Sequence, residues 1–411
     1  MKKLEFPNGI YTVLRPLYYV CKIFGLASYS YVADRRNKRI TTDYGYLNYM
    51  FTVIWLILFS VGMAVKILTL HSVDFDSKIL FFVNMLYCIL LYTSSIVVVV
   101  WVSIIRREKF LEIIENISAV DNKLRYTVQE ETYMNRNVLF NIITEIIILT
   151  FIICPVIIYE IYHMESEPYY LIALEIISNV PDICNALILF QFINLVFMMK
   201  QRNRQLNKRL TTWINGTVSR PIYLNNGNDR HRQFDRTDDH VNIIPVFVSS
   251  VGNTEGILRQ TDIHLLRQIY SELYDITCLI NDTYGIPILV IVCSMLTGVV
   301  LFLYQGLIYL DKWSGQNVTY GITFMLLFFK VTLFCHTATN EARSSSIIVE
   351  KLLLKGNCRK ECVEELKMFS LQLQVMTNEY TACGFFSLNL RLFTSVVSVI
   401  VSYFVIMVQI K

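Results

Sequence analysis

The chain has 411 residues, of which 54% are hydrophobic and only 17% are charged. A soluble protein of this length needs more charged side chains to cover its surface, so the composition excludes a soluble globular protein and predicts an integral membrane protein. The net charge of +4 is too small to indicate a nucleic-acid partner.

Seven apolar stretches have the length that a membrane-crossing helix requires, about 20 residues. They cover residues 47–70, 79–105, 138–159, 170–199, 286–310, 320–337 and 388–410. The chain therefore divides into an N-terminal segment at 1–45, six helices at 46–337, a polar region at 338–387 and a seventh helix at 388–411. We expect an all-α membrane protein.

The distribution of basic residues predicts the orientation of these spans. Almost all Lys and Arg residues lie in the N-terminal segment and in the loops at 106–137, 200–285 and 338–387. The three short loops between the other spans hold only Lys78 and Lys312, and Lys411 ends the chain. The positive-inside rule then predicts a cytosolic N-terminus and an extracellular C-terminus.

Apolar residues at helical spacing also occur outside the spans. The stripe before the fifth span is Leu258, Leu265, Ile269, Leu273, Ile276 and Ile280, and the stripe before the seventh is Cys362, Leu366, Phe369, Leu373 and Met376. Both predict helices that extend into the cytosol. Residues 10–31 predict an amphipathic helix at the cytoplasmic interface, and the polar composition of 215–250 predicts a flexible loop.

The last span differs from a helix that faces only lipid, because it carries Ser395, Ser398, Ser402, Tyr403 and Gln409. Tyr403, Ile406 and Gln409 are spaced by three residues, so they share one face of a helix. A polar stripe on a membrane helix faces either other helices or water. We expect this stripe to be buried or to line a pore.

The same end of the chain carries a resemblance to a known family. It contains Thr381-Ala382-Cys383-Gly384-Phe385-Phe386, then Ser402-Tyr403, five apolar residues and Gln409-Ile410. This resembles the C-terminal signature of the insect gustatory receptors, which is Thr-Tyr, five hydrophobic residues and Gln-Phe. Ser402 replaces the threonine and keeps the hydroxyl. Ile410 replaces the phenylalanine, which puts an aromatic role at the pore mouth in doubt.

The resemblance implies a tastant-gated, nonselective cation channel in the plasma membrane of sensory neurons. Four identical subunits would surround one pore, which would conduct Na⁺, K⁺ and Ca²⁺. Residues 46–337 would bind the ligand, residues 338–387 would form a cytosolic anchor, and residues 388–411 would line the pore. Ile406 and Gln409 would form the constriction, Ile410 would lie at the pore mouth, and Tyr403 would line the pore or pack between helices.

The outer halves of the spans supply the candidate ligand site, because small-molecule sites combine aromatic walls with a few polar groups. We select Asn84, Tyr87, Tyr304, Gln305, Thr323 and Phe324. Aromatic residues nearer the membrane surface, such as Tyr320, are assigned to the interfacial belt. A mostly apolar pocket would favour bitter compounds, and a pocket rich in amides and carboxylates facing aromatics would favour a sugar.

Ionisable residues inside spans are costly and indicate function or pairing. Asp182 and Lys330 lie at similar depth below the outer surface, so we expect them to form an ion pair or to share a cavity. Glu145 lies toward an inner end, where a structural role is expected. Asn317 begins a sequon in a predicted outer loop and is a possible glycosylation site.

No motif in the sequence indicates an enzyme, a cofactor or a metal site. The orientation and the absence of the Asp-Arg-Tyr and Asn-Pro-x-x-Tyr motifs disfavour a G-protein-coupled receptor. A secondary transporter is the other alternative, since such folds use intramembrane charges. Seven spans without a visible internal repeat disfavour it.

Overall fold

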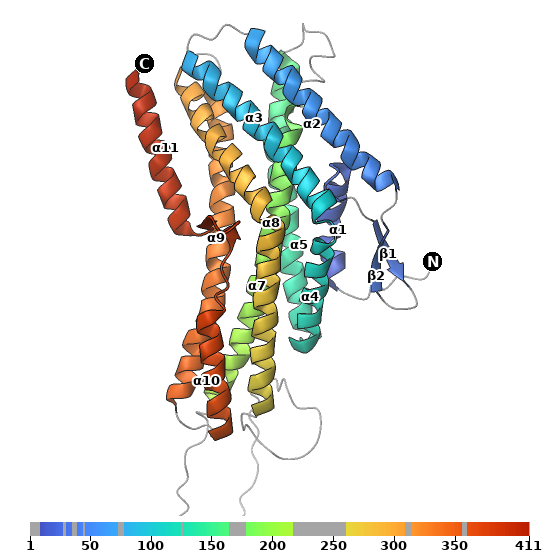
Figure 1. Cartoon of the computed structure of the whole chain (residues 1–411), viewed down its shortest axis with the longest axis vertical. Helices are drawn as coiled ribbons and strands as arrows, with labels where there is room; N and C mark the ends of the chain where they lie inside the picture. Colours follow the sequence, from blue (N-terminus) through green and yellow to red (C-terminus); the bar gives the residue numbers. More distant parts are fainter. Residues whose placement is uncertain are drawn as a thin grey trace, which may run out of the picture.

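The computed structural model describes residues 9–27, 30–34, 39–43, 46–72, 78–124, 126–163, 178–216, 260–308, 314–355 and 360–410. Long helices run side by side through the molecule (Figure 1). They are α1 (Gly9–Ile23), α2 (Tyr46–Ser72), α3 (Lys78–Val100), α4 (Lys109–Leu124), α5 (Val128–His163), α7 (Val180–Gly216), α8 (Gln260–Ile308), α9 (Ser314–Leu354), α10 (Lys360–Val375) and α11 (Leu390–Ile410).

The described helices confirm the predicted all-α membrane fold. Six of them are long and apolar enough to cross a bilayer, namely α2, α3, α5, α7, α8 and α9. The seventh, α11, has a shorter apolar stretch at Leu390–Ile406. The strands in the described part of the chain form two small antiparallel hairpins, β1 (Ser30–Asp34) with β2 (Arg39–Asp43) and β3 (Thr381–Ala382) with β4 (Phe386–Ser387).

Several helix boundaries differ from those predicted, because hydropathy reports where a helix leaves the membrane and not where it ends. The loop predicted at 106–137 contains α4 and the first ten residues of α5. The predicted second span ends in a short π-helix at Trp101–Ile105. Of the predicted fourth span at 170–199, residues 170–177 lie outside the described residues; α7 begins at Val180, directly before Pro181, and continues beyond the predicted end to Gly216. Proline is favoured in the first turn of a helix, which explains this start.

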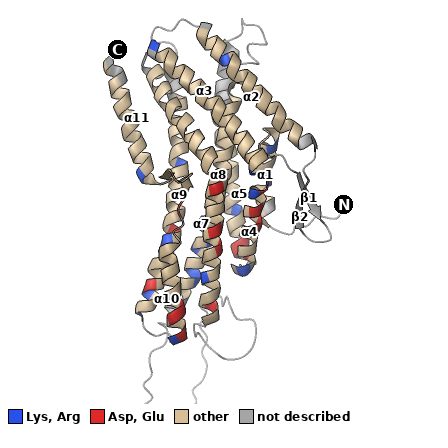
Figure 2. Cartoon of the chain, viewed as in Figure 1, with Lys and Arg blue, Asp and Glu red and all other residues tan. Residues whose placement is uncertain are grey.

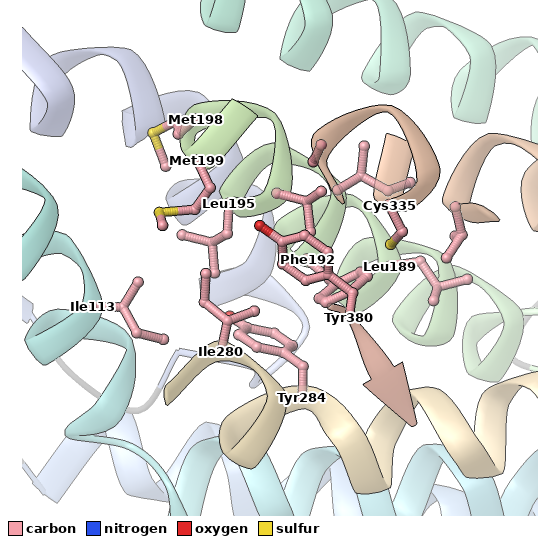
Figure 3. Packing of buried hydrophobic residues seen from close by; sticks show 14 of the residues in the cluster. Ile113, Leu189, Phe192, Leu195, Met198, Met199, Ile280, Tyr284, Cys335 and Tyr380 are labelled. Carbon is pink, nitrogen blue, oxygen red and sulfur yellow. The ribbon is translucent and has the colours of Figure 1, made fainter. Parts of the chain in front are cut away.

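The helix α7 lies at the centre of the bundle and has the largest buried share of the membrane-length helices. Figure 3 shows its residues Leu189, Phe192 and Leu195 packed among Ile280 and Tyr284 of α8 and other buried side chains. The Phe192 ring meets the Tyr380 ring edge to face, with centroids 6.1 Å apart. This core joins α7, α8 and the segment that leads to α11.

The two apolar stripes predicted outside the membrane spans form helices as expected. In α8, Ile269, Leu273, Ile276 and Ile280 are buried, as are Cys362, Leu366, Phe369 and Leu373 of α10, while Met376 packs against the core just beyond the end of α10. The prediction was wrong for Leu265, which is 38% exposed. Ile263 and Leu266 take its place, because the buried face turns slightly around the helix. Leu258 and the predicted loop at 215–250 lie outside the described residues.

The N-terminal helix α1 packs one face on other helices of the protein. Its residues Leu14, Leu17 and Cys21 are buried, and α1 contacts α5 and α7. The backbone carbonyl of Gly25, just after α1, accepts hydrogen bonds from the hydroxyls of Thr52 (3.0 Å) and Ser103 (2.8 Å). The amphipathic pattern was correct, but its apolar face is covered by other helices.

Charged side chains are concentrated at one end of the molecule. Figure 2 shows Asp, Glu, Lys and Arg on α4, α10 and the adjoining parts of α7, α8 and α9, whereas the opposite part of the bundle is almost uncharged. The C-terminal end of α11 lies at this opposite end. The arrangement separates a polar extension from an apolar part of bilayer length, as expected for helices that continue out of a membrane.

Candidate ligand cavity and helix seven

A cavity of about 440 Å³ lies between α5, α7, α8 and α9 in the apolar part of the bundle. Its wall is mostly apolar. The polar side chains in the wall are Glu145, Asn179, Asp182, Asn185, Ser294, Tyr320, Thr323 and Lys330, and the apolar ones include Leu149, Ile183, Leu189, Phe190, Met295, Phe324 and Leu327. A cavity of this volume and composition suits a small organic molecule.

One end of the cavity is closed by a buried ion pair. Lys330 Nζ lies 2.8 Å from Glu145 Oε1, and the Glu145 side chain is only 1% exposed. Asn194 donates to Glu145 Oε2 at 2.6 Å, and Asn141 donates to Oε1 at 3.1 Å. The carboxylate is thus held by one cation and two amides, as a buried charge requires.

The predicted ion pair between Asp182 and Lys330 is therefore wrong, because Lys330 pairs with Glu145. Asp182 and Lys330 do line the same cavity, which was the second form of the prediction. The sequence contained a signal for the correct partner. Glu145 lies seven residues from the inner end of its predicted span (138 to 145), and Lys330 lies seven from the inner end of its own (330 to 337). Because depths were compared from the outer surface only, the equal depth of Glu145 and Lys330 from the inner surface was not noticed.

Asp182 lies in the first turn of α7 at the other polar part of the cavity. The Tyr87 hydroxyl donates to Asp182 Oδ1 over 3.5 Å, which is a long hydrogen bond. The hydroxyl of Tyr320 lies 3.4 Å from Asn179 Oδ1, one residue before α7. These contacts tie α3 and α9 to the start of α7.

The structure brings together some of the predicted ligand residues and separates others. Thr323 and Phe324 line the cavity, and Tyr87 reaches it through Asp182. Asn84 and Gln305 do not line it; Gln305 Nε2 donates to Asn84 Oδ1 at 3.0 Å, so they pair across α3 and α8. Tyr304 is buried in a separate small cluster with Leu80 and Leu301.

The residues that sequence reasoning missed are Asn179, Asn185 and Tyr320. Tyr320 was assigned to the interfacial belt, but its ring stacks on Phe302 with centroids 5.2 Å apart and it lines the cavity. Asn185 Nδ2 donates to Ser94 at 2.8 Å, and Ser95 donates to Asn185 Oδ1 at 3.3 Å. Hydropathy gives no information on which face of a span turns inward, so these residues had no distinguishing signal.

An aromatic wall adjoins Asp182 and depends on a glycine. The Phe302 ring meets Tyr87 edge to face at 5.3 Å between centroids and lies 5.9 Å from Phe324. A Cβ atom at Gly298 of α8 would lie 2.8 Å from Tyr87 and 2.9 Å from Phe324. Only glycine allows these two rings to approach α8 so closely.

The link to α11 is fixed against α8. Asn281 Nδ2 donates to the Glu379 carbonyl at 2.7 Å, and Asn281 Oδ1 accepts from the Thr381 amide at 3.2 Å. In the hairpin turn, Cys383 and Gly384 have φ angles of 51° and 75°. A Cβ atom at Gly285 would lie 2.9 Å from the Cys383 amide nitrogen, so the turn rests directly on the α8 backbone. The Thr381–Phe386 motif thus forms a rigid connection.

The helix α11 packs on α8 and α9 through one face only. Leu392, Phe393 and Val396 contact the core, and Ile400 is buried. Further along, Tyr403 is 57% exposed, Ile406 is 50% exposed and Gln409 is exposed. Figure 1 shows α11 diverging from the bundle toward the C-terminus. The side chain of Ile410 lies outside the described residues.

The serines of α11 lie on its outward side. Ser395, Ser398 and Ser402 are exposed and donate to the carbonyls of Arg391, Thr394 and Ser398. Asn317 was predicted to lie in a loop, but it falls in the first turn of α9, which begins at Ser314. Within the described residues no group of three or more His, Cys, Asp or Glu residues suits a metal ion.

The fold and this geometry define a multi-helix membrane protein with a cavity of small-molecule size and a terminal helix packed through one face. The family model described as 7tm Chemosensory receptor matches residues 14–411, so the chain belongs to this family. The family assignment confirms the resemblance noted at the C-terminus at the level of chemosensory receptors.

Two solved structures are similar to the whole chain. The insect olfactory receptor OR5 from Machilis hrabei in complex with eugenol has 12% sequence identity and a TM-score of 0.69, covering 98% of this chain and 100% of that one. A second structure of OR5 from Machilis hrabei has 9% identity and a TM-score of 0.67, covering 98% of this chain and 99% of that one. At this identity the likeness establishes the fold alone. No curated protein sequence matches the chain.

Proposed function

We propose that the chain is a gustatory receptor that works as a tastant-gated, nonselective cation channel. The exposed polar side of α11 carries this proposal. A helix of bilayer length that turns Tyr403 and Gln409 away from its own bundle would expose an amide to lipid, which is costly. Four copies arranged around an axis would instead turn these groups toward a shared aqueous passage.

The constriction would consist of Ile406 and Gln409, with Ile410 at the mouth and Tyr403 below. A ring of isoleucines narrows and dewets a closed pore, and a ring of neutral amides offers oxygen atoms to partly hydrated cations. No charged side chain belongs to this set, so Na⁺, K⁺ and Ca²⁺ would all pass. The exposed faces of α11 in the single chain leave room for such neighbours.

The cavity between α5, α7, α8 and α9 would bind the tastant. Most of its polar side chains already have protein partners, as with Glu145, Asn185 and Lys330, and the remaining wall is mostly apolar. This favours a bitter-type, largely apolar ligand over a sugar, which would need many free hydrogen-bonding groups. The eugenol complex of OR5 is a precedent for a small organic ligand in this fold.

Ligand binding would act on α11 through α9, which lines the cavity with Phe324 and contacts Phe393 of α11 with Phe328 and Phe329. Moving a closed-to-open ratio from 1:99 to 99:1 requires about 5.5 kcal/mol of differential binding. Shared equally among four sites, this is roughly 1.4 kcal/mol each, comparable with one or two hydrogen bonds. Weak ligands would therefore suffice.

The test is expression of the chain alone in a non-insect cell, with whole-cell current recorded over a panel of bitter compounds and sugars. We expect a ligand-dependent current that reverses near 0 mV in mixed Na⁺ and K⁺ and persists when G-protein signalling is blocked. A current that requires a co-expressed G protein, or substrate uptake without current, would favour a G-protein-coupled receptor or a transporter. Surface labelling of a C-terminal tag in intact cells tests the predicted extracellular C-terminus and the plasma-membrane location.

A further inference from the structure

Within the described residues, one acidic side chain of the cavity wall forms no ion pair. Its ionisable side chains are Glu145, Asp182 and Lys330. Lys330 pairs with Glu145 and also lies 5.8 Å and 5.6 Å from the ring centroids of Phe190 and Phe334. Lys330, the one Lys or Arg among the described residues of the wall, is thus engaged at one end of the cavity, and Asp182 lies at the other.

Asp182 is held by a weak neutral contact. Among the described residues its carboxylate accepts a hydrogen bond from Tyr87 over 3.5 Å and forms no ion pair. A buried carboxylate without a cation costs free energy, and the amide groups at the start of α7 offset only part of this cost. A ligand that brings a positive charge would remove the remainder.

The walls beside Asp182 have the second feature of an ammonium site. Tyr320 and Phe324 line the cavity with centroids 6.5 Å apart, and Phe302 supports both rings from behind. Aromatic faces attract ammonium groups, and the attraction is strongest where water is excluded. A carboxylate next to two aromatic faces therefore favours a protonated amine over a neutral hydroxyl and disfavours an anion.

We propose that the cavity is selective for ligands that carry a protonated amine on an apolar, aromatic body, with the ammonium between Asp182, Tyr320 and Phe324. This inference rests on the proposed ligand cavity and names the chemical class of its ligand. The apolar body would lie along Leu189, Met295 and Leu327 toward the closed end of the cavity.

The experiment compares two ligands of equal length that differ in charge, 4-phenylbutylamine and 4-phenylbutan-1-ol. Binding is measured as the ligand-dependent rise in melting temperature of the purified full chain in detergent, and gating as whole-cell current. We expect the amine to bind at least about tenfold more tightly than the alcohol. Asp182→Asn should weaken amine binding by at least about tenfold and leave alcohol binding within about twofold.

Asp275→Asn is the matched control, because Asp275 is exposed on α8 far from the cavity wall and should change neither affinity. Asp182→Glu keeps the charge and should retain the preference for the amine. If Asp182→Asn fails to fold, the proposal is tested by comparing amine and alcohol affinity in the unchanged protein and in Phe324→Leu. Phe324→Leu should reduce the ratio between amine and alcohol binding.

The proposal is overturned if the alcohol binds as tightly as the amine, if Asp182→Asn leaves amine binding unchanged, or if neither ligand raises the melting temperature. The two proposals fail in different ways. If the amine binds in a way that depends on Asp182 but no current is seen, the channel proposal is contradicted and the amine-site proposal is supported. If the alcohol and the amine evoke equal currents, the channel proposal is supported and the amine-site proposal is contradicted.

Discussion

Phe329 of α9 and Phe393 of α11 meet edge to face, with ring centroids 5.0 Å apart. Phe393 also lies 6.0 Å from Phe328, which is buried. The cavity residues Phe324 and Lys330 lie on the same helix, within about one turn of this contact. A shift of α9 that follows ligand binding would therefore act directly on the first part of α11.

Replacing Phe393 by alanine should separate ligand binding from channel opening. The variant removes the ring contacts with Phe328 and Phe329 and leaves the cavity wall intact, so we expect unchanged binding and at least about a fivefold loss of maximal current. Whole-cell current in expressing cells and thermal-shift binding on the purified chain are measured for each variant. Phe385→Ala is the control, because Phe385 is 77% exposed. Equal loss in the two variants would contradict the coupling role.

Removing the charge of Lys330 should destabilise the protein strongly, because Glu145 would remain buried without a cation. For Lys330→Met we expect a loss of roughly 3–5 kcal/mol in the free energy of unfolding, seen as a lower melting temperature. The double variant Lys330→Met with Glu145→Gln should recover much of this loss, because the buried charge is removed as well. Additive losses in the double-mutant cycle would show that the two side chains do not interact.

Gly298→Ala tests the close approach of Tyr87 and Phe324 to α8. The added methyl group would lie under 3.0 Å from both rings, so the aromatic wall must shift. We expect a cost of about 1–3 kcal/mol in stability and weaker ligand binding. Gly321→Ala is a matched control, since its Cβ would meet Leu303 at 3.6 Å, an ordinary contact. Two variants with the same melting temperature and affinity would contradict the predicted crowding.

Introducing a carboxylate at position 409 should change ion selectivity if four copies surround a pore. A ring of acidic side chains favours divalent cations, so Gln409→Glu should raise the Ca²⁺-to-Na⁺ permeability ratio several-fold. Reversal potentials in mixed solutions measure it. Ser395→Glu, near the opposite end of the same helix and also exposed, is the control. An unchanged ratio for Gln409→Glu would argue against Gln409 at the constriction.

The sequence predicted the buried faces of α8 and α10 well. The stripe from Ile269 to Ile280 and the stripe from Cys362 to Leu373 were recognised from helical spacing, and all these positions are buried. Such patterns are local, because a helix must bury one face whatever covers it. The polar residues of α11 and the C-terminal motif were likewise visible in the sequence, and they led to the correct family.

The sequence by itself determined the membrane class, the apolar helices, the polar helical extensions beyond them and the family. These properties follow from composition and from spacing along one chain. Only the tertiary structure decided that Lys330 pairs with Glu145, that Asn84 and Gln305 bond to each other away from the cavity, and that Tyr320 lines it. Those contacts join residues far apart in the sequence, and they depend on how each helix is rotated about its axis, which hydropathy does not record.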